Sequence, residues 1–250
     1  MRRMPTKELT SAFCDYLLLD CKFDIGGEAV ICRDDETNTL YKIFVLPGSD
    51  IPDYMPDNKF HKIEKLYQKS LQYSVQPLST ITLDGRLIGY EMTYDPYDIS
   101  MYNIKRLSRK QKLFYLRQVK DALEYFASQD ITYGDVKNDN ILINPKTKKV
   151  TFCDMDNIRL GQYPIDVMGY ELSDYIELRG QIDATADAYM HNLLTLQQLN
   201  FSNSSQKEIL TVMRHGVRPI HMPERAMQIV ESLTKPEMFN GEYIIQYIKK

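Results

Sequence analysis

Residues 133–143 read YGDVKNDNILI, in which an apolar strand follows directly behind a run of polar side chains. Residues 150–157 read VTFCDMDN, where an apolar strand instead ends in acidic residues. Two short strands so close along the chain are expected to be neighbours. We therefore expect Asp135, Asn140 and Asp154 to lie in one small volume.

These three side chains offer carboxylate and amide oxygens, with no His or Cys among them. Oxygen donors of this kind suit a hard cation such as Mg²⁺, which usually completes its shell with water and substrate phosphate. The pattern favours a magnesium site at which a phosphorylated ligand also binds.

The spacing of these residues resembles that of the protein-kinase superfamily. That family has a catalytic loop H-R-D-L-x-x-x-N and a metal loop D-F-G. Asn140 follows Asp135 at the family's spacing, Lys137 falls two positions after Asp135, and Asp154 matches the metal-loop aspartate. The resemblance implies that Asp135 positions and deprotonates the attacking hydroxyl, that Lys137 lies beside the transferred phosphate, and that Asn140 and Asp154 hold Mg²⁺.

A lone lysine, Lys42, interrupts the apolar strand expected over residues 40–46. A buried ammonium group needs a partner. Glu64 borders the apolar face of a helix expected over residues 59–73. The resemblance implies that Lys42 binds the α- and β-phosphates of the nucleotide and that Glu64 orients it.

Other parts of a nucleotide site are implied by the same resemblance. Gly26 and Gly27 would form the loop over the phosphates. The segment from Met92 through Thr93 to Asp95 would be the hinge that pairs with adenine through backbone groups. The cofactors implied are ATP and Mg²⁺.

Residues 185–194 resemble the family's buried central helix. The resemblance implies that Asp187 ties down the backbone of the catalytic loop and does no chemistry. The likeness runs from about residue 25 to residue 199.

The expected fold is α+β, a bilobal protein-kinase-like fold that forms one catalytic domain. Residues 1–93 would form a small N-lobe with an antiparallel sheet and one helix, and residues 94–250 a larger, mainly helical C-lobe. In the N-lobe we expect two strands within residues 23–32, then strands 40–46, 80–83 and 86–92, the last two joined by a turn at Asp84 and Gly85. In the C-lobe we expect helix 108–129 with a capping box at Ser108 and Gln111, strands 141–143 and 150–153, and a deeply buried helix 183–199.

The chain departs from the family pattern at several positions. Tyr133 and Gly134 replace His-Arg, which removes the arginine that would bind a phosphorylated activation loop. Glycine before the aspartate also occurs in aminoglycoside and choline kinases, whereas Lys137 is typical of protein kinases. Met155 and Asp156 replace the Phe-Gly of the metal loop, the glycine loop is sparse, and no A-P-E follows residue 160.

Each residue also has a plainer interpretation. Asp135 and Asn140 could be turn residues, and the two adjacent glycines a hairpin. Lys42 could extend from an edge strand to solvent. Glu64 could be a solvated helix residue, and Asp187 a surface acid near a helix start.

Composition excludes little beyond disorder and a disulfide-rich fold. The 250 residues include 31 Lys and Arg and 34 Asp and Glu, so a net charge of −3 gives no general attraction to nucleic acid or anionic membrane. The four cysteines form no C-x-x-C pair, and no apolar run approaches the roughly 18 residues of a membrane span. We expect free thiols and a cytoplasmic protein with no nucleic-acid or membrane partner.

The expected function is ATP- and Mg-dependent transfer of a phosphoryl group to a hydroxyl acceptor, on a protein or a small molecule, by a protein Ser/Thr kinase-like enzyme. A small-molecule kinase of the aminoglycoside or choline kinase type is one alternative. A pseudokinase, which binds nucleotide and serves as a scaffold, is the other.

Overall fold

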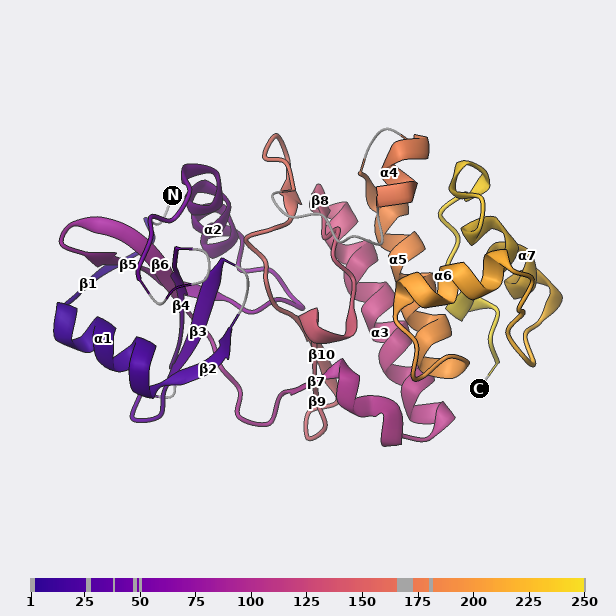
Figure 1. Cartoon of the computed structure of the whole chain (residues 1–250), viewed down its shortest axis with the longest axis horizontal. Helices are drawn as coiled ribbons and strands as arrows, with labels where there is room; N and C mark the ends of the chain where they lie inside the picture. Colours follow the sequence, from indigo (N-terminus) through magenta and orange to yellow (C-terminus); the bar gives the residue numbers. More distant parts are fainter. Residues whose placement is uncertain are drawn as a thin grey trace. The chain divides into compact units, whose positions relative to one another are not determined.

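A computed structural model of the chain describes residues 3–25, 28–37, 39–46, 49, 51–165, 173–179 and 182–249. The fold is α+β, with a mixed six-stranded sheet and several helices. Contacts divide the chain into two compact units, unit 1 (Met1–Pro96) and unit 2 (Tyr97–Lys250) (Figure 1). Each unit is described by itself below.

Unit 1 is built on the six-stranded sheet, whose strand order is β1-β5-β6-β4-β3-β2. The strands are β1 (Thr6–Leu9), β2 (Lys22–Ile25), β3 (Ala29–Asp34), β4 (Thr39–Phe44), β5 (Pro77–Leu83) and β6 (Arg86–Met92). The predicted strands, β2 to β6, pair antiparallel, as expected, but β1, which was not predicted, pairs with β5 in parallel, so the sheet is mixed and not antiparallel throughout. The four residues of β1 are too few and too polar to give an alternating pattern.

The described residues of unit 1 form two helices, α1 (Ser11–Asp20) and α2 (Asp57–Lys69), where one was predicted. Helix α1 was missed because apolar residues occur nearly all round it, so it shows no stripe. Helix α2 ends earlier than predicted, because Ser70 adopts a left-handed conformation with φ 47°.

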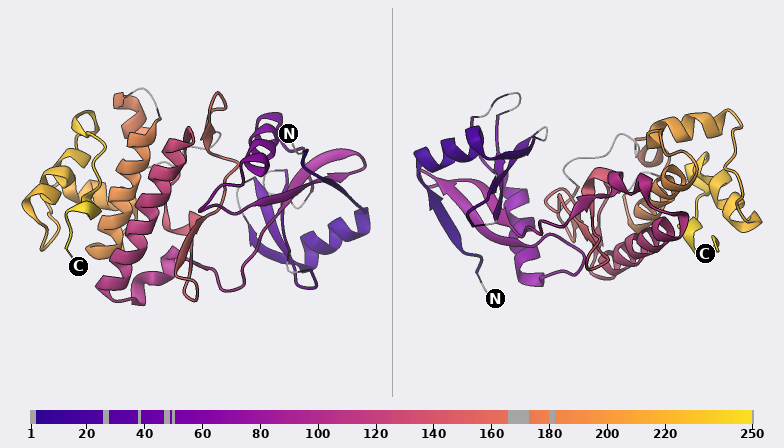
Figure 2. Two further views of the ribbon diagram at one scale, coloured as in Figure 1. Left: turned by 180° about the vertical axis from the view of Figure 1, so that it is seen from behind. Right: turned by 90° about the horizontal axis from the view of Figure 1, so that it is seen from below.

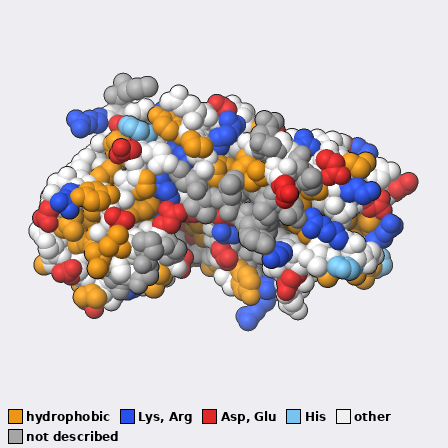
Figure 3. Space-filling model, turned by 45° about the horizontal axis from the view of Figure 1, so that its top comes forward, with side chains coloured by type: hydrophobic (Ala, Val, Ile, Leu, Met, Phe, Trp, Pro, Cys, Tyr) orange, Lys and Arg blue, Asp and Glu red, His pale blue; other side chains and the backbone are white. Residues whose placement is uncertain are grey.

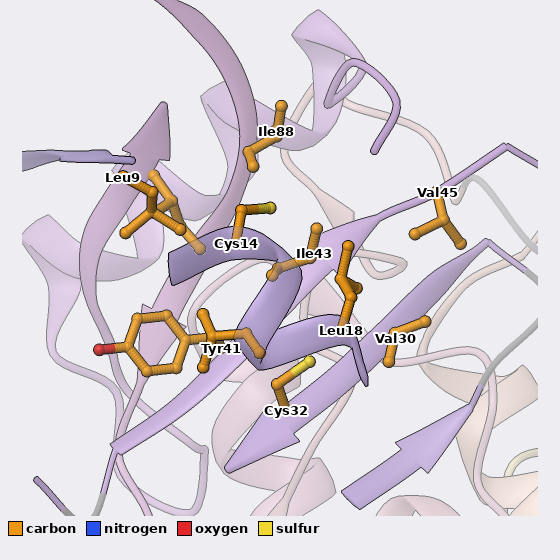
Figure 4. Close-up of a cluster of buried hydrophobic side chains, with 11 residues drawn as sticks. Leu9, Cys14, Leu18, Val30, Cys32, Tyr41, Ile43, Val45 and Ile88 are labelled. Atoms are coloured by element: carbon orange, nitrogen blue, oxygen red, sulfur yellow. The ribbon is translucent and has the colours of Figure 1, made fainter. Parts of the chain in front are cut away.

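The two faces of the sheet differ in character because side chains alternate along each strand. Tyr41, Ile43 and Val45 join the apolar cluster that packs against α1 (Figure 4). Lys42 and Phe44 therefore lie on the opposite face of β4. The hairpin between β5 and β6 turns at Asp84 and Gly85, both with positive φ, as the sequence predicted.

Unit 2 is mainly helical. Helices α3 (Arg109–Ser128) and α5 (Ala184–Leu199) pack side by side (Figure 2). The predicted capping box between Ser108 and Gln111 is present, and α5 is buried along nearly all its length, as predicted. The remaining helices are α4 (Ser173–Arg179), α6 (Gln206–Arg214) and α7 (Glu224–Leu233), with 3-10 turns η1 (Met101–Arg106), η2 (Asn138–Asn140), η4 (Pro236–Met238) and η5 (Ile244–Gln246).

Short strands complete unit 2. The predicted hairpin of β9 (Ile141–Asn144) and β10 (Lys149–Phe152) is extended by β7 (Ile99–Ser100), and β8 (Ile131–Thr132) pairs with β11 (Arg159–Leu160). The four cysteines are free thiols. Within the described ranges, no helix has the length and apolar character to span a membrane. Charged side chains of both signs are interspersed on the face drawn in Figure 3.

Candidate functional site

The backbone of the predicted catalytic loop is anchored by a buried carboxylate. Asp187, in the first turn of α5, accepts hydrogen bonds from the backbone N–H groups of Tyr133 (2.8 Å) and Gly134 (2.7 Å). Its side chain is 1% exposed, so the interpretation as a surface acid was wrong. Burial raises the pKa of Asp187 to about 7, although the two N–H groups act in the opposite direction.

Gly134 occupies the position at which the protein-kinase loop has arginine. The local backbone conformation explains why glycine is present here. Its φ is +77°, in the left-handed region that favours glycine. A Cβ atom at this position would lie 2.4 Å from Cδ1 of Ile165. A long side chain is therefore disfavoured at this position by both backbone conformation and space.

Asp135 and Asn140, which were predicted to share one small volume with Asp154, are joined by hydrogen bonds, and Lys137 contacts the same carboxylate. Oδ2 of Asp135 accepts hydrogen bonds from Nζ of Lys137 (2.7 Å) and Nδ2 of Asn140 (2.7 Å). Nδ2 of Asn140 also donates to the backbone oxygen of Asp135 (3.2 Å). The carboxylate group is thus fixed on one side by a cation and an amide.

The other oxygen of Asp135 differs sharply from the first. Oδ1 is buried, and no residue in the described part of the chain donates a hydrogen bond to it. Burial raises the pKa of Asp135, as does the nearby charge of Asp154, while Lys137 and Asn140 lower it. A buried carboxylate oxygen without a donor is costly and calls for an explanation.

Asp154 reaches this region through the β9–β10 hairpin. Phe152 pairs with Ile141, and beyond this pair the backbone N–H of Cys153 donates to the oxygen of Asn140 (3.0 Å). The next residue is Asp154, which has a left-handed φ of 58°. Nδ2 of Asn157 donates to its Oδ2 (2.6 Å). A left-handed conformation is uncommon for residues other than glycine, and Asp154 adopts it.

Asn140 and Asp154 carry oxygen atoms of the kind that Mg²⁺ prefers as ligands. Nδ2 of Asn140 donates to Asp135, which leaves the amide oxygen as the atom of this side chain able to act as a metal ligand. The described residues hold no cluster of three or more His, Cys, Asp or Glu side chains suited to a metal. The binding of Mg²⁺ by Asn140 and Asp154 stays a prediction.

Sequence reasoning missed a set of amides that hold the same loop. Nδ2 of Asn138 donates to Oε1 of Gln197 (2.7 Å), and Nε2 of Gln198 donates to Oδ1 of Asn138 (2.6 Å). Nε2 of Gln206 donates to the backbone oxygen of Val136 (3.1 Å). The one available signal was that Gln197 and Gln198 continue an otherwise apolar helix.

In unit 1, Lys42 is buried at 7% exposure, with its Nζ 5.8 Å from the ring centre of Phe44. Glu64 is half-buried on α2. Lys59 of α2 forms an ion pair with Glu28, which directly precedes β3. The burial of Lys59 and Lys62 was not predicted. Both lysines lie on the buried face of α2, at the same helical spacing as its apolar residues. The pairing of Lys42 with Glu64 stays a prediction.

The remaining predicted ligands belong to the phosphate loop and the hinge. Gly26 and Gly27 lie outside the described residues. Met92 ends β6 and is buried, whereas Thr93 is exposed and its backbone N–H donates to Gln76 (2.9 Å). Asp95 is half-buried. Their contact with adenine stays a prediction.

The chain was compared with known proteins. No family model matches the sequence, and no curated protein matches it. Function is therefore inferred from the residues of the two units.

Proposed function

We propose that this protein is a phosphotransferase that moves the γ-phosphoryl group of ATP to a hydroxyl acceptor with the help of Mg²⁺. The observation that carries the proposal is the asymmetry of Asp135. One oxygen of its carboxylate binds Lys137 and Asn140, and the other is buried with no donor in the described part of the chain. An acceptor hydroxyl would supply the donor that this oxygen lacks.

A general base needs to reach the proton that it removes and to have a pKa nearer the working pH than a free carboxylate has. Burial moves the pKa of Asp135 in that direction. Lys137 and Asn140 hold the carboxylate in one orientation, so that Oδ1 is the oxygen left to meet the hydroxyl group. The arrangement suits the removal of a proton from an alcohol at its attack on phosphorus.

The other roles follow the resemblance. Asn140 and Asp154 would hold Mg²⁺, which draws charge from the phosphates when it is bound. Lys42, buried on the α2 side of the sheet, would bind the nucleotide phosphates. We propose a protein Ser/Thr hydroxyl as the acceptor because Lys137 has the spacing of protein kinases.

Two other functions have an observation in their favour. A small-molecule acceptor is favoured by Gly134, where backbone and Ile165 disfavour an arginine that would bind a phosphorylated loop. A nucleotide-binding scaffold is favoured by Asp154, because one of its oxygens already accepts from Asn157.

The test is Asp135→Asn in the full chain, assayed for transfer of labelled γ-phosphate to a panel of proteins, sugars and amino alcohols. We expect turnover to fall by about 10²- to 10⁴-fold, with binding of Mg·ATP retained. Asp121→Asn, on the exposed side of α3, is the matched control and should keep wild-type turnover. Equal turnover in Asp135→Asn and wild type would refute the base. Binding of Mg·ATP by the wild type with no transfer to any acceptor would favour the scaffold.

A further inference from the structure

Three lysines are buried in unit 1. Lys42 belongs to β4, and Lys59 and Lys62 belong to α2; their exposed fractions are 7%, 3% and 0%. Lys42 and Phe44 share the face of the sheet opposite to the one that α1 covers. Unit 1 thus has one face packed with apolar side chains (Figure 4) and one face at which cations are buried.

Two of these ammonium groups approach the same aromatic ring. Nζ of Lys42 lies 5.8 Å from the ring centre of Phe44, and Nζ of Lys59 lies 5.3 Å from it. A ring face attracts a cation, but the two cations repel each other. Anionic groups close to these two ammonium groups therefore stabilise their burial.

Glu28 supplies one such anion. Its Oε2 binds Nζ of Lys59, and its side chain is 45% exposed whereas that of Lys59 is 4% exposed. The carboxylate therefore reaches Lys59 from the solvent side. The backbone oxygen of Glu28 accepts from the N–H of Val45 (3.1 Å), which fixes the start of β3 against the end of β4.

This geometry allows a bound phosphate to displace Glu28. A phosphate chain bound by Lys42 would lie near Lys59, because both ammonium groups approach the ring of Phe44, and it would compete with the carboxylate of Glu28 for Lys59. A lysine suits this exchange, because its ammonium group is a point charge on a flexible stem.

We propose that Lys59 is a second phosphate-binding residue of unit 1, which acts beside Lys42 and is held by Glu28 until a phosphate chain takes the carboxylate's place. The identity of that chain as the triphosphate of ATP rests on the proposed function. On this account α2 contributes a cation to the nucleotide, in addition to any role of Glu64.

The experiment measures equilibrium binding to the full chain by calorimetry, with three probes: Mg·ATP, adenosine and inorganic tripolyphosphate. Lys59→Met should weaken Mg·ATP and tripolyphosphate by about 10- to 100-fold, the range for the loss of a charge-assisted hydrogen bond, and leave adenosine unchanged. Lys59→Arg should restore most of the affinity. Glu28→Gln should tighten Mg·ATP by a few-fold, because the competing charge is gone.

Lys65→Met is the matched control, since Lys65 is exposed on the same helix. It should bind all three probes as the wild type does. A thermal melt of each variant checks folding, and Glu28→Gln provides a test even if Lys59→Met fails to fold. Wild-type affinity for Mg·ATP in Lys59→Met, or weaker binding of Mg·ATP by Glu28→Gln, would overturn the proposal.

The same probes separate this inference from the proposed function. Tripolyphosphate binding that depends on Lys59, in a chain that binds neither adenosine nor Mg·ATP, would support the anion site and refute the nucleotide. Mg·ATP binding and phosphoryl transfer that are unaffected by Lys59→Met would support the function and refute the role of Lys59.

Discussion

Unit 1 and unit 2 differ in the ionisable groups that they bury. Among the described residues, the buried charged side chains of unit 1 are three lysines and Asp34, whereas those of unit 2 are Asp135, Asp156 and Asp187, with no buried Lys or Arg. Phosphates are anions, and a metal ion and a departing proton are cations. Under the proposed function, the lysines of unit 1 would bind the phosphate chain, and the carboxylates of unit 2 would hold the metal ion and accept the proton.

The two units also hold these charges differently. The lysines of unit 1 stand on regular elements and carry their charge at the end of flexible stems. Asp135 of unit 2 stands on an irregular loop whose backbone is fixed by Asp187 and Gln206. The site of unit 2 should consequently depend on the exact course of its backbone, and the site of unit 1 on close packing between strands.

Two glycines test this contrast, and the largest effect is expected in unit 1. A Cβ atom on Gly89 of β6 would lie 2.0 Å from the backbone oxygen of Lys42, which cannot move without breaking the pairing of β4 with β6. Gly89→Ala should lower the free energy of unfolding by about 3 kcal/mol or more. Gly134→Ala should cost about 2 kcal/mol, because its φ is positive but the atom it meets is the tip of the Ile165 side chain.

Urea denaturation of each variant measures these losses. Gly85→Ala is the control, because Gly85 has a positive φ of 72° but no atom within 4 Å of the added Cβ. Its cost should be about 1 kcal/mol. A loss for Gly89→Ala no greater than that of the control would show that β4 can shift, and would contradict close packing as the feature that positions Lys42.

The division of charge itself is tested by nucleotide binding with and without Mg²⁺. Lys42→Met should weaken ATP by about 10- to 100-fold in both conditions, because the lysine contacts phosphate directly. Asp154→Asn should weaken ATP by a similar factor with Mg²⁺ present and little without it, because the carboxylate acts through the metal. Calorimetric titration with ATP in Mg²⁺ and in EDTA measures both.

The matched control is Lys105→Met in unit 2, whose ammonium group lies over the ring of Tyr102 and outside the proposed site. It should bind ATP as the wild type does in both conditions. If Asp154→Asn lost affinity equally with and without Mg²⁺, its role as a metal ligand would be refuted, and the assignment of the cation to unit 2 with it.

The amides of unit 2 should show a smaller effect. Gln198→Ala removes the donor to Oδ1 of Asn138, a buried residue of the loop that contains Asp135 and Asn140. An unsatisfied buried acceptor costs about 1–3 kcal/mol, and we expect a loss of stability near the lower end because the rest of the loop stays anchored. Gln118→Ala, which removes a hydrogen bond to Lys148 at the surface, should cost less than about 0.5 kcal/mol. Equal losses for the two variants in urea denaturation would contradict a role for the amides.

The parts of the fold that sequence could predict are those whose signal is local. The capping box at Ser108 and Gln111, the turn at Asp84 and Gly85, and the β9–β10 hairpin each depend on residues a few positions apart. Helix α1 and strand β1 were missed because one lacks an apolar stripe and the other is four residues long.

The candidate site could be predicted where the spacing of residues along the chain determines which of them are in contact. Asp135, Lys137 and Asn140 lie within one loop, so their order along the chain nearly determines their contact. The binding of Asp187 to that loop came from the resemblance, and the structure confirms it. The buried lysines of α2 and the Asn138–Gln198 pair could not be predicted, because burial of a lysine contradicts the usual pattern and amide pairing depends on tertiary packing.

The smallest expected effect concerns two titratable groups one turn apart on α5. Burial raises the pKa of Asp187 to about 7 and lowers that of His191 to about 4. Between about pH 4 and 7 the folded chain holds the Asp187 proton that the unfolded chain releases, so this residue makes stability fall as the pH rises. Between about pH 6.5 and 4 the unfolded chain binds a proton that folded His191 does not, so this residue makes stability fall as the pH drops.

In the wild type, Asp187 and His191 change the free energy of unfolding in opposite directions as the pH rises. Replacing one residue at a time should reveal the contribution of the other. In urea denaturation at pH 4.5 and 6.5, His191→Gln should be more stable at pH 4.5, because the Asp187 slope is no longer opposed. Asp187→Asn should be more stable at pH 6.5, because only the His191 slope remains from this pair. Asp135, whose pKa burial also raises, titrates in both variants and so does not alter the difference between them. Parallel pH profiles in the two variants would mean that both slopes are absent, so that neither Asp187 nor His191 has a shifted pKa in the folded chain, and that Asp187, which anchors the loop, stays negatively charged over the pH range tested.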